Sequence, residues 1–147
     1  MALTEKKTGV SRQFAASSAV AGLARDQVAS ALREWELSFL VPDAALVMGE
    51  LVANAIVASG LADVIKVHVG FRVAEVVLAV WDRCDGRPLV QKVELSLETL
   101  DLREENFDDN GGWGLSIVES LASRCWVEPT RPSGKWVCAA LKLEERR

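Results

Sequence analysis

The sequence lacks the features that mark several large classes of protein. It has no run of five or more basic residues, and 17 basic against 21 acidic side chains give a net charge of −4. Because nucleic-acid binders present clustered positive charge to phosphates, this composition argues against DNA or RNA as a direct partner. The N-terminus has no apolar segment of signal-peptide length, and no window holds 18 uninterrupted apolar residues. We therefore expect a cytoplasmic protein without a membrane partner.

Cysteine and histidine are too few and too poorly spaced for a structural zinc site. Cys84, Cys125 and Cys138 form no CxxC pair, and His68 is the sole histidine. We therefore expect reduced, partly buried thiols. The four prolines are scattered, and no repeat or Gly/Ser linker divides the 147 residues. A chain of this length can bury a sufficient core without a metal or disulfide, so we predict one domain spanning residues 1–147.

Apolar periodicity predicts two helices in the first half of the chain. Residues 17–35 place apolar side chains at i, i+3 and i+4, with charged residues on the opposite side. A second helix is expected to begin after Pro42, where Asp43 can cap the first turn, and to end near Ser59. This second helix is apolar on nearly all sides, which predicts that it is buried.

Short apolar runs predict five strands, at residues 10–15, 64–72, 76–81, 125–127 and 136–143. His68 falls on the polar side of the second of these strands. A third helical pattern begins at Leu115 and continues to about Arg124, after an acid-rich stretch at 91–110 that indicates a long functional loop. Strands and helices do not alternate one for one, which excludes a doubly wound parallel sheet. We predict a two-layer α/β sandwich with helices on one face of a mostly antiparallel sheet.

Two polar side chains interrupt the apolar second helix. Glu50 and Asn54 stand four residues apart and therefore share one face. Burying an unpaired polar group costs roughly 2–7 kcal/mol on transfer scales, so both residues need a purpose. One interpretation is a pair of hydrogen bonds to neighbouring elements. The other is chemistry, in which the carboxylate acts as a base and the amide oxygen binds a hard cation such as Mg²⁺.

Two further segments carry candidate binding groups. Asp82 ends the apolar run 76–81, where it could accept the exocyclic amine of a purine or simply start a turn. The glycines of 111–114 precede a predicted helix, so their N–H groups could cradle phosphate oxygens, or the segment could be a hinge. A dinucleotide-binding loop needs a strand directly before it. The acidic segment 104–110 has no strand pattern, which excludes that interpretation.

In this order, the three segments resemble the nucleotide-binding boxes of the GHKL ATPases, which have the Bergerat fold. Residues 50–56 resemble the N box, 80–86 the G1 box and 112–118 the G2 box. Within that superfamily the short chain is similar to the anti-sigma-factor serine/threonine kinases of the RsbW type and their actinobacterial relatives. The resemblance covers about residues 11–143 and implies a single histidine-kinase-like ATP-binding domain.

The resemblance implies ATP and Mg²⁺ as cofactors and gives each matching residue a role. Asn54 would ligate the Mg²⁺, Glu50 would be the general base, and Asp82 would bind the adenine amine. Further nucleotide contacts would come from Gly86, Gly112, Gly114 and Leu115. The implied reaction is phosphoryl transfer from ATP to a serine of an anti-sigma-factor antagonist, by a protein that also holds a sigma factor inactive. The relatives are often homodimers.

Three positions depart from the family pattern. Cys84 replaces the first G1 glycine, Ala58 stands where relatives often carry histidine, and Trp113 stands where they often carry arginine. Because the changes at 58 and 113 remove polar groups expected near the phosphates, an alternative is a non-catalytic module. Such a module would bind a sigma factor or antagonist with degenerate or purely structural nucleotide binding. Lys135 and the basic tail 146–147 are interpreted as solvated charges.

Overall fold

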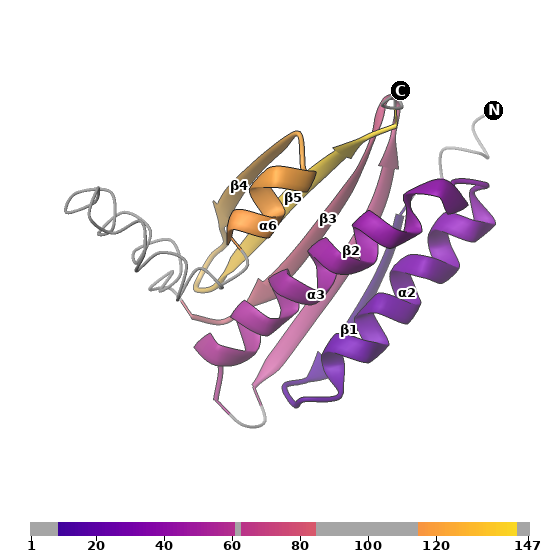
Figure 1. The fold of residues 1–147 in the computed structure, drawn as a ribbon. Coiled ribbons are helices and arrows are strands. Elements are labelled where there is room, and N and C mark those ends of the chain that lie inside the picture. Colours follow the sequence, from indigo (N-terminus) through magenta and orange to yellow (C-terminus); the bar gives the residue numbers. More distant parts are fainter. Residues whose placement is uncertain (1–8, 61–62, 85–114, 144–147) are drawn as a thin grey trace.

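The computed structural model describes residues 9–60, 63–84 and 115–143. In these ranges the chain forms one sheet with helices packed against it (Figure 1). The elements, in chain order, are β1 (Gly9–Ala15), α2 (Val20–Glu34), a short 3-10 turn (Ser38–Leu40), α3 (Val41–Ala58), β2 (Val64–Arg72), β3 (Glu75–Asp82), α6 (Leu115–Leu121), β4 (Arg124–Pro129) and β5 (Lys135–Lys142).

The sheet has the strand order β1-β2-β3-β5-β4, and every neighbouring pair is antiparallel. β2 and β3 form an antiparallel hairpin, whereas β5 lies beside β3 although β4 precedes it in the chain. Helices α2, α3 and α6 all lie on one face of this sheet (Figure 1). The predicted two-layer sandwich is therefore confirmed, as is each of the five predicted strands to within a few residues at its ends.

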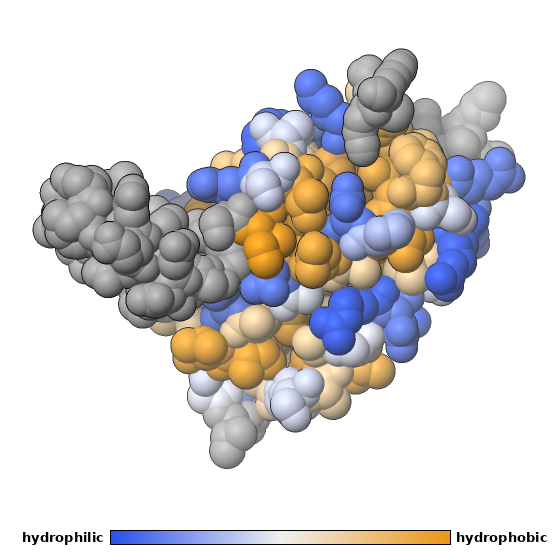
Figure 2. Space-filling model, viewed as in Figure 1, coloured by the Kyte–Doolittle hydropathy of each residue, from blue (hydrophilic) through white to orange (hydrophobic). Residues whose placement is uncertain are grey.

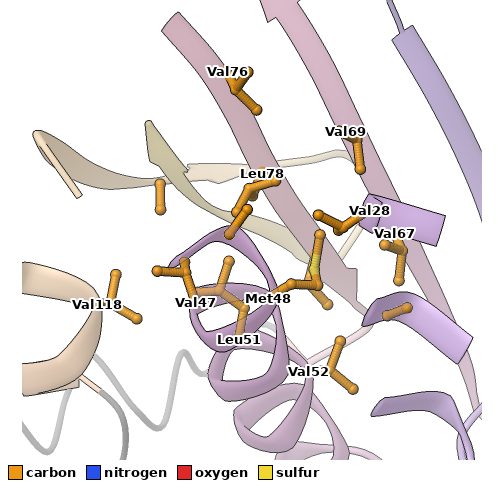
Figure 3. Close-up of a cluster of buried hydrophobic side chains, with 14 of the residues drawn as sticks. Val28, Val47, Met48, Leu51, Val52, Val67, Val69, Val76, Leu78 and Val118 are labelled. Atoms are coloured by element: carbon orange, nitrogen blue, oxygen red, sulfur yellow. The ribbon is translucent and has the colours of Figure 1, made fainter. Parts of the chain in front are cut away.

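The core lies between helices α2 and α3 and strands β2 and β3. Because side chains alternate across a strand, every second residue of β2 and β3 points toward the helices. Figure 3 shows these side chains meeting α3 and α2, with Val118 of α6 alongside. The fully or nearly fully buried members labelled there are Val28, Val47, Met48, Leu51, Val52, Val67, Val69, Val76, Leu78 and Val118. Burying each such side chain contributes about 1.5–3 kcal/mol, before the entropy of ordering it is subtracted.

The start of α3 differs from the sequence prediction. The helix begins at Val41, before Pro42, with Leu40 as its N-cap and no side-chain capping hydrogen bond. Proline fits in a first turn because its missing N–H would have no helical partner there. Asp43 lies in the first turn rather than at the cap. Its negative charge still favours the positive end of the helix dipole. α6 ends at Leu121, three residues before the predicted limit.

The prediction that α3 is buried on nearly all sides is wrong. Its inner side is buried, but Leu46 is 47% exposed and Val57 is 83% exposed. Apolar surface is visible among polar groups over this layer of the molecule in Figure 2. The segment Ser38–Ala58 is long and apolar enough to cross a membrane by length and composition alone. In the structure, however, its inner face packs against β3 and β5, so the requirements of the core explain its composition.

The turn between β4 and β5 is fastened to the end of β3. Trp81 Nε1 donates to Thr130 Oγ1 at 2.9 Å, and Thr130 N donates to the carbonyl oxygen of Gly134 at 2.9 Å. Gly134 has φ +92°. A Cβ atom there would lie 2.7 Å from Trp81 Cε2 and 2.8 Å from the carbonyl oxygen of Asp82. Only glycine fits this turn, which delivers Lys135 opposite Asp82 in the sheet register.

We expect Gly134→Ala to destabilise the fold by at least about 1–3 kcal/mol, the usual cost of a strained backbone conformation, with the steric overlap adding to it. Urea unfolding measures the change. Gly22→Ala is the matched control, because a Cβ at this helical position meets nothing within 4 Å. That substitution should stabilise α2 by roughly 0.8–1 kcal/mol through helix propensity. Equal unfolding midpoints for the two variants would show that the turn does not need glycine.

Candidate functional site

Glu50 and Asn54 lie on one side of α3, at the border between its buried face and solvent. Both side chains are half-buried, whereas Leu51 and Val52 between them are buried. The two side chains are therefore less buried than the apolar helix suggested, and the desolvation argument for a special role is weaker. Half-burial leaves part of each side chain exposed to solvent.

Asp82 lies at the end of β3 and is only 2% exposed. Residues two apart on a strand point to the same face, so Asp82 lies with Val80 on the helix side of the sheet. The backbone N–H of Cys84 donates to Asp82 Oδ1 at 2.9 Å, so Asp82 does start the turn. The turn interpretation is thus confirmed, and the base-binding interpretation must be judged from the other contacts of the same carboxylate.

Lys135 is the main partner of that carboxylate, and the prediction that Lys135 is a solvated charge is wrong. It is 2% exposed, and its Nζ lies 2.7 Å from Asp82 Oδ1 and 3.1 Å from Oδ2. The same ammonium donates to the carbonyl oxygen of Cys84 at 3.0 Å. The pair forms because β3 and β5 place Asp82 and Lys135 directly opposite each other. One sequence signal could have revealed this pair: an acidic residue ends one apolar strand and a basic residue begins another.

Part of the predicted site falls outside the described residues. Gly86, Gly112 and Gly114 lie there, while Leu115 is the first residue of α6 and only its backbone is described. α3 packs against both β3 and α6. The end of β3, the C-terminal part of α3 and the start of α6 all lie toward the same end of the molecule, at the left of Figure 1. This arrangement is compatible with one shared site, but convergence of all three boxes around one cavity stays a prediction.

A cavity formed by described residues lies elsewhere. It has a volume of about 420 Å³ and is lined by Gln13, Asp63, Val64, Lys66, Trp81 and Arg83. Lys66 and Trp81 belong to the sheet face that points away from the helices, where the Lys66 ammonium lies 4.6 Å from the centroid of the Trp81 ring. This cavity therefore does not contain Glu50, Asn54 or Asp82.

The donor set on α3 suits magnesium better than zinc. Among the described residues, no group of three His, Cys, Asp or Glu side chains could hold a metal ion. Mg²⁺ in phosphate-binding sites commonly takes only one or two protein oxygens, with water and phosphate oxygens completing its shell. An amide at Asn54 beside a carboxylate at Glu50 fits that pattern. Asp82 fits its expected role in binding the adenine base less well, since its carboxylate already has a cationic partner.

Cys125, Cys138 and His68 lie outside this site, whereas Cys84 contacts Asp82 and Lys135 through its backbone. All three cysteines are free, as predicted, although Cys125 is exposed. Burial raises the pKa of Cys138 to about 12, so this thiol stays protonated. His68 lies on the sheet face away from the helices, where its Nδ1 is 2.7 Å from Ser11 Oγ. Burial, aided by the positive charge of Arg72, lowers the pKa of His68 and keeps the ring neutral at pH 7.

A five-stranded antiparallel sheet with helices on one face, and with Glu50 and Asn54 on the central helix, is consistent with the fold of the GHKL ATPase class. A comparison with family models agrees. The model of the histidine kinase-like ATPase domain matches residues 10–141, so the chain belongs to that family. No curated protein matches the chain.

The buried ion pair of Asp82 and Lys135 leads to a prediction about stability. Lys135→Ala should destabilise the fold by about 3–5 kcal/mol, because it leaves the carboxylate of Asp82 buried without its partner. The control is Arg83→Ala, which removes a more exposed pair with Asp63 at 3.5 Å and should cost less than about 1 kcal/mol. Urea unfolding of both variants measures the difference. Similar small losses would mean that Asp82 and Lys135 are not paired in solution.

Proposed function

We propose that this ATP-binding regulatory domain is an anti-sigma factor with serine/threonine kinase activity toward an anti-sigma-factor antagonist. The observation that carries the proposal is the placement of Glu50 and Asn54 one helical turn apart at the half-buried edge of α3, within a histidine kinase-like ATPase domain. A cytoplasmic location and a sigma factor as the second partner belong to the same proposal. β1 lies at the edge of the sheet, where a second copy of the chain could pair with it.

Each residue of the pair has a distinct part in the proposed reaction. The amide oxygen of Asn54 is a hard donor and would hold Mg²⁺, which neutralises charge on the phosphates when ATP is bound. The carboxylate of Glu50 would accept the proton of the incoming serine hydroxyl. Residues at i and i+4 have Cβ atoms about 5–6 Å apart, so base and metal ligand are held beside each other by the helix itself.

A non-catalytic binding module is the second candidate, and one observation favours it. The carboxylate proposed to bind adenine is already neutralised by Lys135 and sealed from solvent. Recognition of the base would then be weak, and the protein could sequester a sigma factor or antagonist with nucleotide in a structural role or none. The two candidates differ in two measurable properties, namely stabilisation by nucleotide and phosphoryl transfer.

Mg-ATP should stabilise the protein. At 100 times its dissociation constant a ligand adds about 2.7 kcal/mol to the free energy of unfolding, which corresponds to roughly 5–10 °C in Tm for a domain of this size. Thermal melting with and without Mg²⁺ measures this shift. Asn54→Ala should remove the part of the shift that requires Mg²⁺. Val57→Ala, on the exposed surface of the same helix, should keep it. The absence of any shift in the unaltered protein would favour the module without nucleotide.

Phosphoryl transfer tests the kinase directly. Antagonist proteins that co-purify with the chain would be incubated with ATP labelled at the γ-phosphate. Glu50→Gln should reduce incorporation by about 10²-fold or more, because the base is lost while its shape is kept. Asp43→Asn is the matched control, since this carboxylate lies at the other end of α3 and should not matter. Incorporation that survives both Glu50→Gln and Asn54→Ala would refute the assigned roles.

A further inference from the structure

We propose that Lys135 determines the nucleotide specificity of the site, by occupying the carboxylate that would otherwise read the base. This inference rests on the proposed nucleotide binding. Asp82 and Lys135 form a closed ion pair, so nucleotides are held mainly through their phosphates and the base is read weakly. The chain should therefore discriminate poorly between ATP and a purine triphosphate that lacks the 6-amine.

The hydrogen bonds of the pair leave little for a ligand. An ammonium group has three N–H donors, and Lys135 directs them at Asp82 Oδ1, Asp82 Oδ2 and the carbonyl oxygen of Cys84. Asp82 Oδ1 also accepts the backbone N–H of Cys84. No donor of Lys135 is left to contact a ring nitrogen. The carboxylate has spare acceptor capacity chiefly at Oδ2, and that residue is almost fully enclosed.

The surrounding structure holds Lys135 in place. Its backbone is part of β5, directly opposite Asp82, and it follows a turn that only Gly134 can make. Trp81 fastens that turn through Thr130. Lys135 therefore differs from a surface lysine, whose side chain can move aside at little cost. To reach Asp82, a base amine would have to displace a hydrogen bond from a cationic donor and replace it with a weaker one from a neutral donor.

Charge at this position also changes which bases are rejected. A bare carboxylate attracts the 6-amine of adenine and repels the 6-carbonyl of hypoxanthine, so it separates ATP from ITP. Once a cation neutralises the carboxylate, both the attraction and the repulsion are reduced. The accessible groups on α3, Glu50 and Asn54, are unaffected, since neither takes part in the pair. Affinity for the triphosphate should thus be independent of the residue at 135.

The test is to titrate Mg-ATP, Mg-ITP and inorganic triphosphate into the unaltered protein and into Lys135→Thr, with calorimetric detection. We expect ATP and ITP to bind the unaltered protein within about threefold of each other. Lys135→Thr should prefer ATP by about tenfold or more, because sites that hydrogen-bond a polar group strongly reject analogues lacking it. Triphosphate affinity should be the same in both proteins.

Three further variants keep the result interpretable. Lys135→Arg retains the cation and should retain the weak discrimination. Lys142→Thr makes the same chemical change at an exposed position of β5 and should also behave as the unaltered protein. If Lys135→Thr does not fold, Lys135→Gln removes the cation and keeps an N–H donor for Asp82. It keeps the carboxylate without its neutralising charge, so it too should prefer ATP.

Two results would overturn the inference while leaving nucleotide binding intact. The first is a tenfold preference for ATP in the unaltered protein. The second is an ATP-to-ITP ratio that does not change in Lys135→Thr or in Lys135→Gln. If neither the unaltered protein nor any folded variant binds ATP, ITP or triphosphate, then nucleotide binding itself fails and this inference fails with it.

Discussion

The packing of α2 and α3 against β2 and β3 is the constraint on which the rest of the molecule depends. The apolar sides of these four elements form most of the buried cluster, and α6 and β5 add to its margins. Because β2 alternates with a period of two and β3 pairs with it, burying the apolar side chains of β2 on the helix side fixes which residues of both strands face the helices. This register directs Asp82 to the side of the sheet that the helices cover. Glu50 and Asn54 lie at the edge of the buried face of α3.

The buried ion pair is the feature that distinguishes this site from a simple base pocket. A carboxylate enclosed to this degree needs a partner, and Lys135 supplies one within the chain itself. Such pairs contribute little net stability compared with an apolar substitute, although breaking one is costly. This pair forms because the register of β3 and β5 sets the two residues opposite each other. The half-buried Glu50 and Asn54 on α3 and the enclosed pair of Asp82 and Lys135 are thus two chemically different sets of polar groups.

Local patterns in the sequence were sufficient for most of the fold. Period-two alternation located β2 to the residue, and helical periodicity located α2 and α3, because each pattern reflects burial of one face. The start of α3 was missed because proline is compatible with a first turn, so it did not mark the boundary. Burial of α3 was overestimated, since apolar composition alone does not reveal that Val57 faces solvent.

The sequence by itself determined the fold class, the family and the spacing of Glu50 and Asn54, since all of these follow from contacts between near neighbours along the chain or from short motifs. Only the tertiary structure decided the environment of Asp82. Its partner lies 53 residues away, in a strand reached after α6 and β4, and no local periodicity encodes which strand ends adjoin. Pairing between distant strands is set by the global arrangement of the sheet. For this reason the sequence indicated a surface charge at Lys135, whereas the fold buries it.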